Sequence, residues 1–142
     1  MRQNLSLLFF GSVLLHSPAL AEAVPEGVHN DTNGASNVCG ITGRNALAIS
    51  DKLRSDPTIA EKPSGSRRFK TYFSSVETKQ WTVTTKEEAA YPAVTCVHIF
   101  HSGGGTDMKR NMRCDASRKA CDALYLEFRA HDEQIRRQVR GG

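Results

Sequence analysis

Apolar residues recur every three or four positions in the last third of the 142-residue chain. This spacing places them on one stripe of an α-helix, while charged residues such as Asp132 fall outside it. Asp115 or Ser117 can cap the start of this helix, and Gly141 can end it. The pattern predicts a long amphipathic C-terminal helix whose stripe consists of Ala120, Cys121, Leu124, Phe128, His131, Ile135 and Val139.

Residues 67–85 follow an alternating pattern instead, which is typical of strands. Apolar and polar side chains alternate first around Phe69 and Phe73 and then, after a break, around Trp81 and Val83. Two strands separated by a short polar break favour a hairpin. We therefore expect an antiparallel strand pair in this part of the chain.

A second strand pair follows. Residues 93–100 are apolar at both parities, which indicates a central strand covered on both faces. A glycine loop at 103–105 then leads into a partner strand, 108–114. In this strand we expect Met108 and either Asn111 or Met112 to point inward, and Lys109, Arg110 and Arg113 to point mostly outward.

The first half of the chain carries weaker signals. Residues 43–55 have a narrow apolar face and end at Asp56-Pro57, which predicts a short helix. Residues 57–66 are rich in turn formers and are expected to form a connection. Residues 22–38 are polar, contain glycine and proline and lack a period, so we expect a flexible N-terminal arm before a single domain, 39–142.

Together these elements predict an α+β domain. We expect an antiparallel sheet of three or four strands with the long C-terminal helix packed across one face. The shorter N-terminal helix is expected beside it, and disulfides are expected to hold the domain together.

The N-terminus resembles an export signal. Arg2 precedes an apolar run of 11 residues, Leu5–Leu15, and Ala19-Leu20-Ala21 fits a cleavage site, so residues 1–21 are predicted to be a signal peptide. The run is shorter than the roughly 20 residues that a membrane-spanning helix needs. We therefore expect a soluble periplasmic or secreted protein with no transmembrane segment after cleavage. The formal net charge of +4 is too modest to favour nucleic-acid binding.

The four cysteines favour two disulfides, because an even number in an exported chain is more typical of bridges than of a metal site or a nucleophile. We favour Cys114 with Cys121, since the short loop closes easily once the helix starts near Ser117, and Cys39 with Cys96. A bridge between Cys96 and Cys114, facing each other across the second strand pair, is an alternative.

One candidate site is a metal centre. Imidazole and thioether ligands suit copper, and His98, His101, Met108 and Met112 lie within fifteen residues. Residues three apart on a strand point to opposite faces, however, so the two histidines converge only at a bulge. Metal binding therefore stays an alternative, and we predict no cofactor.

Two further candidates are weaker still. Backbone N–H groups of Gly103–Gly105 could cradle an anion near Lys109, but such loops normally open a helix and this one opens a strand. A hydrolase using Ser102 with His101 or His131 and Asp107 lacks the sequence around a nucleophilic serine. A flexible turn is the simpler interpretation, and an enzyme is the third choice.

The last candidate is a basic binding surface. Arginines gather toward the end of the long helix, at Arg129, Arg136, Arg137 and Arg140, and a second basic group is Arg67, Arg68 and Lys70. Arginine side chains among aromatic residues suit an acidic protein or envelope component. The predicted function is therefore a small non-enzymatic binding protein, an accessory of an envelope complex or an inhibitor of an exported enzyme.

Overall fold

The computed structural model describes residues 28–29, 34–103 and 105–140, and this part of the chain holds two helices and eight strands. The predicted signal peptide lies outside the described residues. The predicted arm does so in part, and its described residues contain two short strands, β1 (Val28–His29) and β2 (Ser36–Val38). Regular structure therefore begins before Cys39, the residue at which the sequence placed the start of the domain.

The centre of the fold is an antiparallel meander of β5 (Phe69–Ser74), β6 (Lys79–Thr84), β7 (Ala93–Ser102) and β8 (Gly105–Cys114). These are the two strand pairs predicted from the sequence, the first from its alternating pattern and the second from its apolar run and glycine loop. Strand β7 lies between β6 and β8, as its apolar residues at both parities indicate. The hairpin of β7 and β8 is the longest pairing, from Ala93 opposite Cys114 to Ser102 opposite Gly105.

The predicted number of strands was wrong. Strand β4 (Ala60–Lys62) adds to β5 at one edge, and β1 pairs in parallel with β8 at the other, which gives a six-stranded sheet with the order β1-β8-β7-β6-β5-β4. Strands β2 and β3 (Ile41–Gly43) form a separate two-stranded sheet. Strand β4 is exposed along its whole length and β1 has two residues, so neither leaves an alternating pattern in the sequence.

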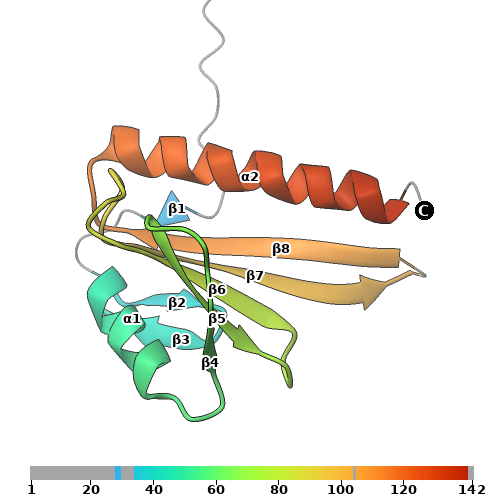
Figure 1. The fold of residues 1–142 in the computed structure, drawn as a ribbon, viewed down its shortest axis with the longest axis horizontal. Coiled ribbons are helices and arrows are strands. Elements are labelled where there is room, and N and C mark those ends of the chain that lie inside the picture. The colour runs from blue at the N-terminus through green and yellow to red at the C-terminus, as the bar shows by residue number, and fades with distance from the viewer. Residues whose placement is uncertain (1–27, 30–33, 104, 141–142) are drawn as a thin grey trace, which may run out of the picture.

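Helix α1 (Ala46–Ser55) is capped by Asn45, whose Oδ1 accepts the Ala48 N–H at 2.8 Å. It was expected beside the long helix, and this was wrong. Helix α1 and the β2–β3 hairpin cover one face of the main sheet, and helix α2 (Arg118–Arg140) covers the other (Figure 1). The sheet therefore lies between two layers, each with its own core.

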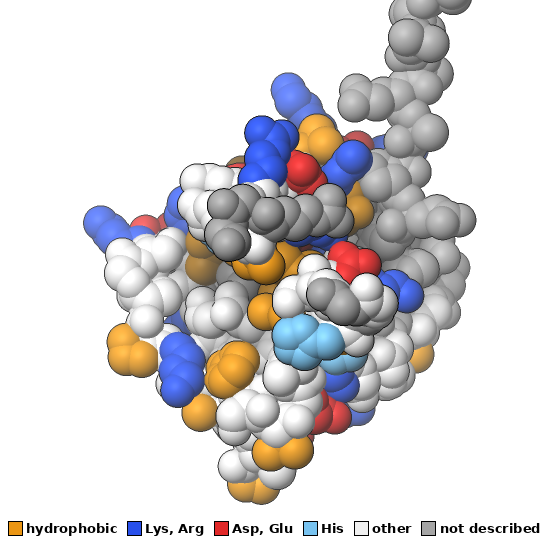
Figure 2. Space-filling model, turned by 90° about the vertical axis from the view of Figure 1, so that its right-hand side faces the viewer, with side chains coloured by type: hydrophobic (Ala, Val, Ile, Leu, Met, Phe, Trp, Pro, Cys, Tyr) orange, Lys and Arg blue, Asp and Glu red, His pale blue; other side chains and the backbone are white. Residues whose placement is uncertain are grey.

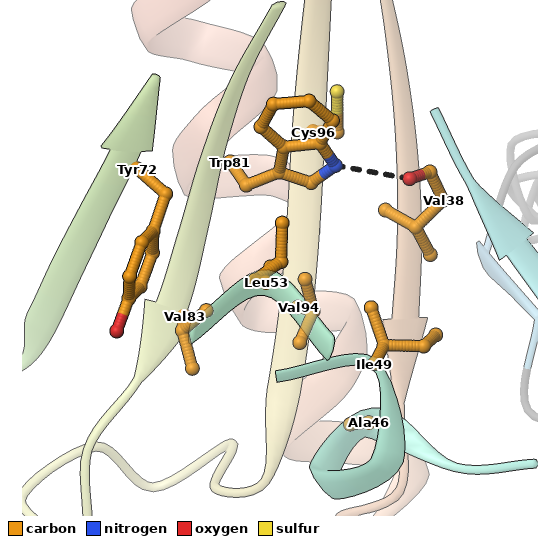
Figure 3. Packing of buried hydrophobic residues seen from close by; sticks show 9 residues of the cluster. All are labelled: Val38, Ala46, Ile49, Leu53, Tyr72, Trp81, Val83, Val94 and Cys96. Carbon is orange, nitrogen blue, oxygen red and sulfur yellow. Dashed lines mark hydrogen bonds between the residues drawn. The ribbon is translucent and has the colours of Figure 1, made fainter. Parts of the chain in front are cut away.

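The core under α1 is centred on Trp81, which is fully buried and donates from Nε1 to the Val38 carbonyl at 3.0 Å (Figure 3). This bond joins the main sheet to the β2–β3 hairpin. Around Trp81 pack apolar residues of α1 and the sheet, including Ile49, Leu53, Tyr72, Val83, Val94 and Cys96. The disulfide between Cys39 and Cys96 closes this core on the side of β2–β3.

The core under α2 is smaller. Cys121, Leu124 and Tyr125 pack on Ala93, Met112 and Cys114 of the sheet. The centroids of the Phe69 and Phe128 rings are 5.5 Å apart. The second disulfide, Cys114–Cys121, fastens the first turn of α2 to the end of β8. Both disulfides have the pairing that the sequence favours. Ser117 caps α2 as expected, since its Oγ accepts the Ala120 N–H at 3.3 Å.

Helix α2 runs along the whole β7–β8 hairpin (Figure 1). Its 23 residues span about 34 Å at ~1.5 Å per residue, close to the about 33 Å of a ten-residue strand. The apolar stripe of α2, however, is not continuous along this length. His131 and Val139, predicted to face the core, are exposed, and Asp132, predicted to face solvent, is 3% exposed.

No helix in the described part of the chain is long and apolar enough to cross a membrane. The two disulfides are typical of proteins that fold outside the cytoplasm.

Candidate functional site

The β7–β8 hairpin extends beyond the rest of the main sheet. Pairing between β6 and β7 stops at Lys79 opposite His98, whereas the hairpin continues for four more residue pairs. Only the last turns of α2 run alongside this extension (Figure 1). We call residues 99–108 of the hairpin and residues 129–140 of α2 the hairpin end, and it faces the viewer in Figure 2.

A buried ion pair fastens α2 to β8 next to the hairpin end. The Arg110 guanidinium donates to both carboxylate oxygens of Asp132, at 2.6 Å each, and the side chains are only 9% and 4% exposed. Arg110 also donates to Thr95 Oγ1 at 3.0 Å and lies 4.7 Å from the centre of the Phe128 ring. The predicted outward direction of Arg110 was wrong, because this parity of β8 faces α2.

Arg113 was also predicted to point outward and is 1% exposed. It belongs to the opposite face of β8, where it contacts Asp115 at 2.5 Å and Ser36 Oγ at 2.9 Å. Asp115 Oδ2 in turn accepts the backbone N–H of Ala46 at the start of α1, at 2.5 Å. Arg113 therefore joins β8 to β2 and α1 and is not part of a binding surface.

The four predicted partner-binding arginines have different surroundings. Arg136 donates to the Met108 carbonyl at 2.8 Å and lies 3.9 Å from an Asp107 oxygen, so it fastens α2 to the hairpin. Arg129 is exposed, and no described residue pairs with it. Arg137 is 79% exposed and reaches Glu133 at 3.4 Å. The side chain of Arg140 lies outside the description.

The second basic group is neutralised within the protein. Arg68 contacts Glu88 at 2.5 Å and Glu127 at 2.8 Å, and these hydrogen bonds raise the pKa of its guanidinium above the usual value. Arg67 pairs with Glu87 at 3.1 Å and Lys70 with Glu61 at 3.3 Å. At the hairpin end, by contrast, the charge of Asp132 is used inside the fold. The exposed Glu133 is shared by Arg136 and Arg137, which leaves the charge of Arg129 without a partner among the described residues; Figure 2 shows blue and red side chains side by side around the end of α2.

Exposed apolar side chains lie on the hairpin, on α2 and on a turn that contacts the hairpin. Ile99 is 38% exposed on the hairpin, Val139 is 54% exposed on α2, and Val76 is 87% exposed in the turn between β5 and β6. In this turn the Thr78 carbonyl accepts the Ile99 N–H at 3.2 Å, and Thr78 Oγ1 donates to the Ile99 carbonyl at 2.8 Å. The turn therefore supports the extension at its base.

The structure does not bring the proposed metal ligands together. His98 pairs with Lys109 and His101 with Thr106, which places the two histidines on opposite faces of the hairpin. His98 lies 5.5 Å from the Phe100 ring, and His101 Nδ1 lies 3.1 Å from Thr106 Oγ1. Met112 is in the core under α2. Among the described residues, no group of three or more His, Cys, Asp and Glu suits a metal ion.

The other candidate chemistry is equally dispersed. Gly103, at a φ of +58°, supports the turn between β7 and β8, and Gly105 is already in β8. Asp107 accepts the Met108 N–H at 2.7 Å and faces Arg136, while His131 is exposed on α2. The catalytic group considered from the sequence is therefore not assembled among the described side chains.

The sequence contains a signal for the buried ion pair that the pattern analysis missed. Arg110 has the same parity as Met108, Met112 and Cys114, and Asp132 follows Leu124 and Phe128 at intervals of four. Both charges thus lie on the apolar faces of their own elements. Two opposite charges at such positions indicate an internal pair.

No protein-family model, curated protein or solved structure matches this chain.

Proposed function

We propose that this protein acts outside the cytoplasm as a non-enzymatic binding protein, and that it binds an acidic partner protein through the hairpin end. The observation that carries the proposal is the contrast between the basic groups. The other arginine cluster is paired with glutamates, whereas Arg129 has no partner among the described residues and Arg137, 79% exposed, shares Glu133 with Arg136, in a part of the molecule that projects beyond the sheet.

The composition of the hairpin end supports a protein partner. Protein interfaces are enriched in arginine and apolar side chains, and a few anchors supply most of the binding energy. Here the exposed Val139 lies on α2 together with Arg129 and Arg137, and the exposed Ile99 lies on β7 of the hairpin along which α2 runs. Positive charge around them favours an acidic surface, mainly by increasing the association rate.

The two disulfides and the predicted signal peptide support a periplasmic or secreted location. In that setting the partner would be an enzyme that this protein inhibits or a component of an envelope complex.

The test combines a photo-crosslinking residue at position 99 with charge reversal. We expect crosslinking to one acidic partner in the exported fraction, and we expect Arg129→Glu/Arg137→Glu to reduce the yield at least tenfold. The matched control is Arg118→Glu/Lys119→Glu, which reverses two exposed charges in the first turn of the same helix. A crosslinker at position 119 should capture no such partner.

Equal losses in both double variants would contradict the location of the surface. Full retention of crosslinking after reversal at 129 and 137 would contradict the acidic partner.

A further inference from the structure

A cleft opens beside α1, on the face of the sheet away from α2. Helix α1 covers β6 and β7 but leaves β5 partly uncovered, because its buried residues Ile49 and Leu53 pack around Trp81 and Val94. The space that remains between α1 and β5 is a cleft of about 250 Å³. Ligand sites commonly have volumes of ~300 to 1,000 Å³, so this one suits a small molecule.

The floor and one wall of the cleft are apolar. Val83, Tyr72 and Ala93 of the sheet and Ala46 of α1 line it, and all four are almost completely buried. Tyr72 and Val83 lie at the β5 side of the core in Figure 3. Leu47, which is 46% exposed, lines the same cleft from α1. An apolar body of a ligand would therefore contact mainly Leu47, because the other four side chains expose 8% of their surface or less.

The charged residues that line the cleft are all cations: Arg54 on α1, Lys70 on β5 and Lys86 after β6. Arg54 pairs with Asp51 on its own helix, and Lys70 with Glu61 at 3.3 Å. Lys86 is exposed, and no described residue pairs with its ammonium group. Of the three cations, Lys86 is therefore the one whose charge is not offset by a described acid.

Tyr72 adds a hydroxyl group that stays protonated. Burial, followed by the negative charge of Glu61 nearby, raises the pKa of the Tyr72 phenol, and Arg54 opposes this rise. The phenol donates to Glu61 Oε2 at 3.2 Å. Glu61 contacts both Tyr72 and Lys70, and Asp51 contacts Arg54, so an arriving anion would compete with one carboxylate at each of these cations and meet none of the described acids at Lys86.

We propose that this cleft binds a small organic anion, a carboxylate or phosphate ester attached to an apolar body. The apolar part packs on Val83, Tyr72 and Leu47, and the anionic group is held by Lys86 and Arg54. Hydrogen bonds between such cations and an anion are stronger than neutral ones, which makes the charge the main source of selectivity. The site lies on α1 and the sheet and is independent of the partner surface at the hairpin end.

The probes are benzoate and phenyl phosphate, titrated into the isotope-labelled protein and followed by amide chemical shifts. We expect saturable shifts in residues 46–54 and 83–93, with benzyl alcohol, the neutral analogue of benzoate, binding at least tenfold more weakly. Inorganic phosphate should bind more weakly than phenyl phosphate, because it lacks the apolar body. The relative affinities of the two organic anions indicate which anionic group the cleft accepts better.

Variants distinguish this site from general attraction to a basic protein. Arg54→Gln/Lys86→Gln should reduce the affinity for the better probe at least tenfold, and Leu47→Trp should do the same by filling the cleft. Arg44→Gln, which removes an exposed charge outside the cleft, and the hairpin-end variant Arg129→Glu/Arg137→Glu should leave the affinity unchanged.

The proposal is overturned if benzyl alcohol binds as well as benzoate, if the shifts map to the hairpin end, or if both cleft variants retain the affinity. Loss of partner crosslinking with unchanged benzoate binding would concern only the proposed protein partner.

Discussion

The two faces of the main sheet are covered by helices that are held in different ways. Under α1 the contacts are apolar along the whole helix, from Ala46 to Leu53, and Trp81 at the centre has no exposed surface. Under α2 the apolar contacts end near Phe128, and the remaining turns are fastened by Arg110 with Asp132 and by Arg136 with the Met108 carbonyl.

The contacts under α1 therefore mainly stabilise the domain, whereas the contacts under the second half of α2 mainly fix the position of that helix. Apolar burial is large but non-directional, whereas a buried ion pair contributes little net stability and fixes geometry. The second half of α2 is thus held in register along the projecting hairpin. We infer that it presents Arg129 and Arg137 at defined positions while adding little to the stability of the domain.

The largest effect is expected at the centre of the α1 face. Trp81→Ala should lower the free energy of unfolding by about 3 to 5 kcal/mol, because it leaves a cavity and removes the bond to Val38. Urea unfolding measures the change. Leu126→Ala, at a residue 49% exposed on α2, is the control and should change stability by less than about 0.5 kcal/mol.

The next largest effect is expected at the two disulfides, whose contributions to stability differ because they close loops of different length. Cys39–Cys96 spans 57 residues and Cys114–Cys121 spans 7. The chain-entropy relation then assigns about 4 kcal/mol to the first bridge and about 2.5 kcal/mol to the second. We expect Cys39→Ala/Cys96→Ala to lower the unfolding midpoint in urea more than Cys114→Ala/Cys121→Ala. The reverse order would show that fastening α2 matters more than loop length.

On the α2 face, Asp132→Ala leaves the Arg110 charge buried without its partner. We expect a loss of about 3 kcal/mol in the free energy of unfolding and faster amide exchange in residues 129–140. Asp122→Ala is the matched control on the same helix, since its pair with Arg118 is exposed and contributes under about 0.5 kcal/mol.

A double variant shows whether the pair gives stability or position. Arg110→Met/Asp132→Leu replaces both charges by apolar groups and should recover most of the lost stability. If it also reduces crosslinking from position 99, the pair fixes the geometry of the binding surface. Stability well below that of Asp132→Ala would contradict the difference proposed between the two faces.

The sequence predicts the central strands and the helices of this fold well and the edge strands of the sheet poorly. Strands β5 and β6 and helix α2 show a period, β7 is recognisable as an apolar run, and α1 has a narrow apolar face, because each of these elements packs at least one face into a core. Strands β1 and β4 have two and three residues and lie at the sheet edges, so no period can reveal them. The β2–β3 turn has one recognisable signal in the sequence, Gly40. Gly40 and Cys39 form the two-residue turn, and both have a positive φ.

The two candidate sites differ in the same respect. The Arg110–Asp132 pair could be read from the parity of β8 and the spacing on α2. The cleft could not, because it depends on where α1 crosses the sheet. That position is set by the packing of Ile49 and Leu53 around Trp81, a contact between distant parts of the chain. Sequence patterns assign faces to elements but do not place one element over another.

The smallest effect is expected at alkaline pH and concerns Tyr72, at the β5 side of the core under α1. Because Tyr72 has a raised pKa in the folded state, the folded protein holds this proton more tightly than the unfolded chain. Its contribution is fully present below the unfolded value, near pH 10, and is lost as the pH rises through the folded pKa. We expect Tyr72→Phe to flatten this decline in stability above about pH 10. An equal decline in wild type and Tyr72→Phe would show that neither burial nor the charge of Glu61 raises the pKa of the Tyr72 phenol in the folded protein.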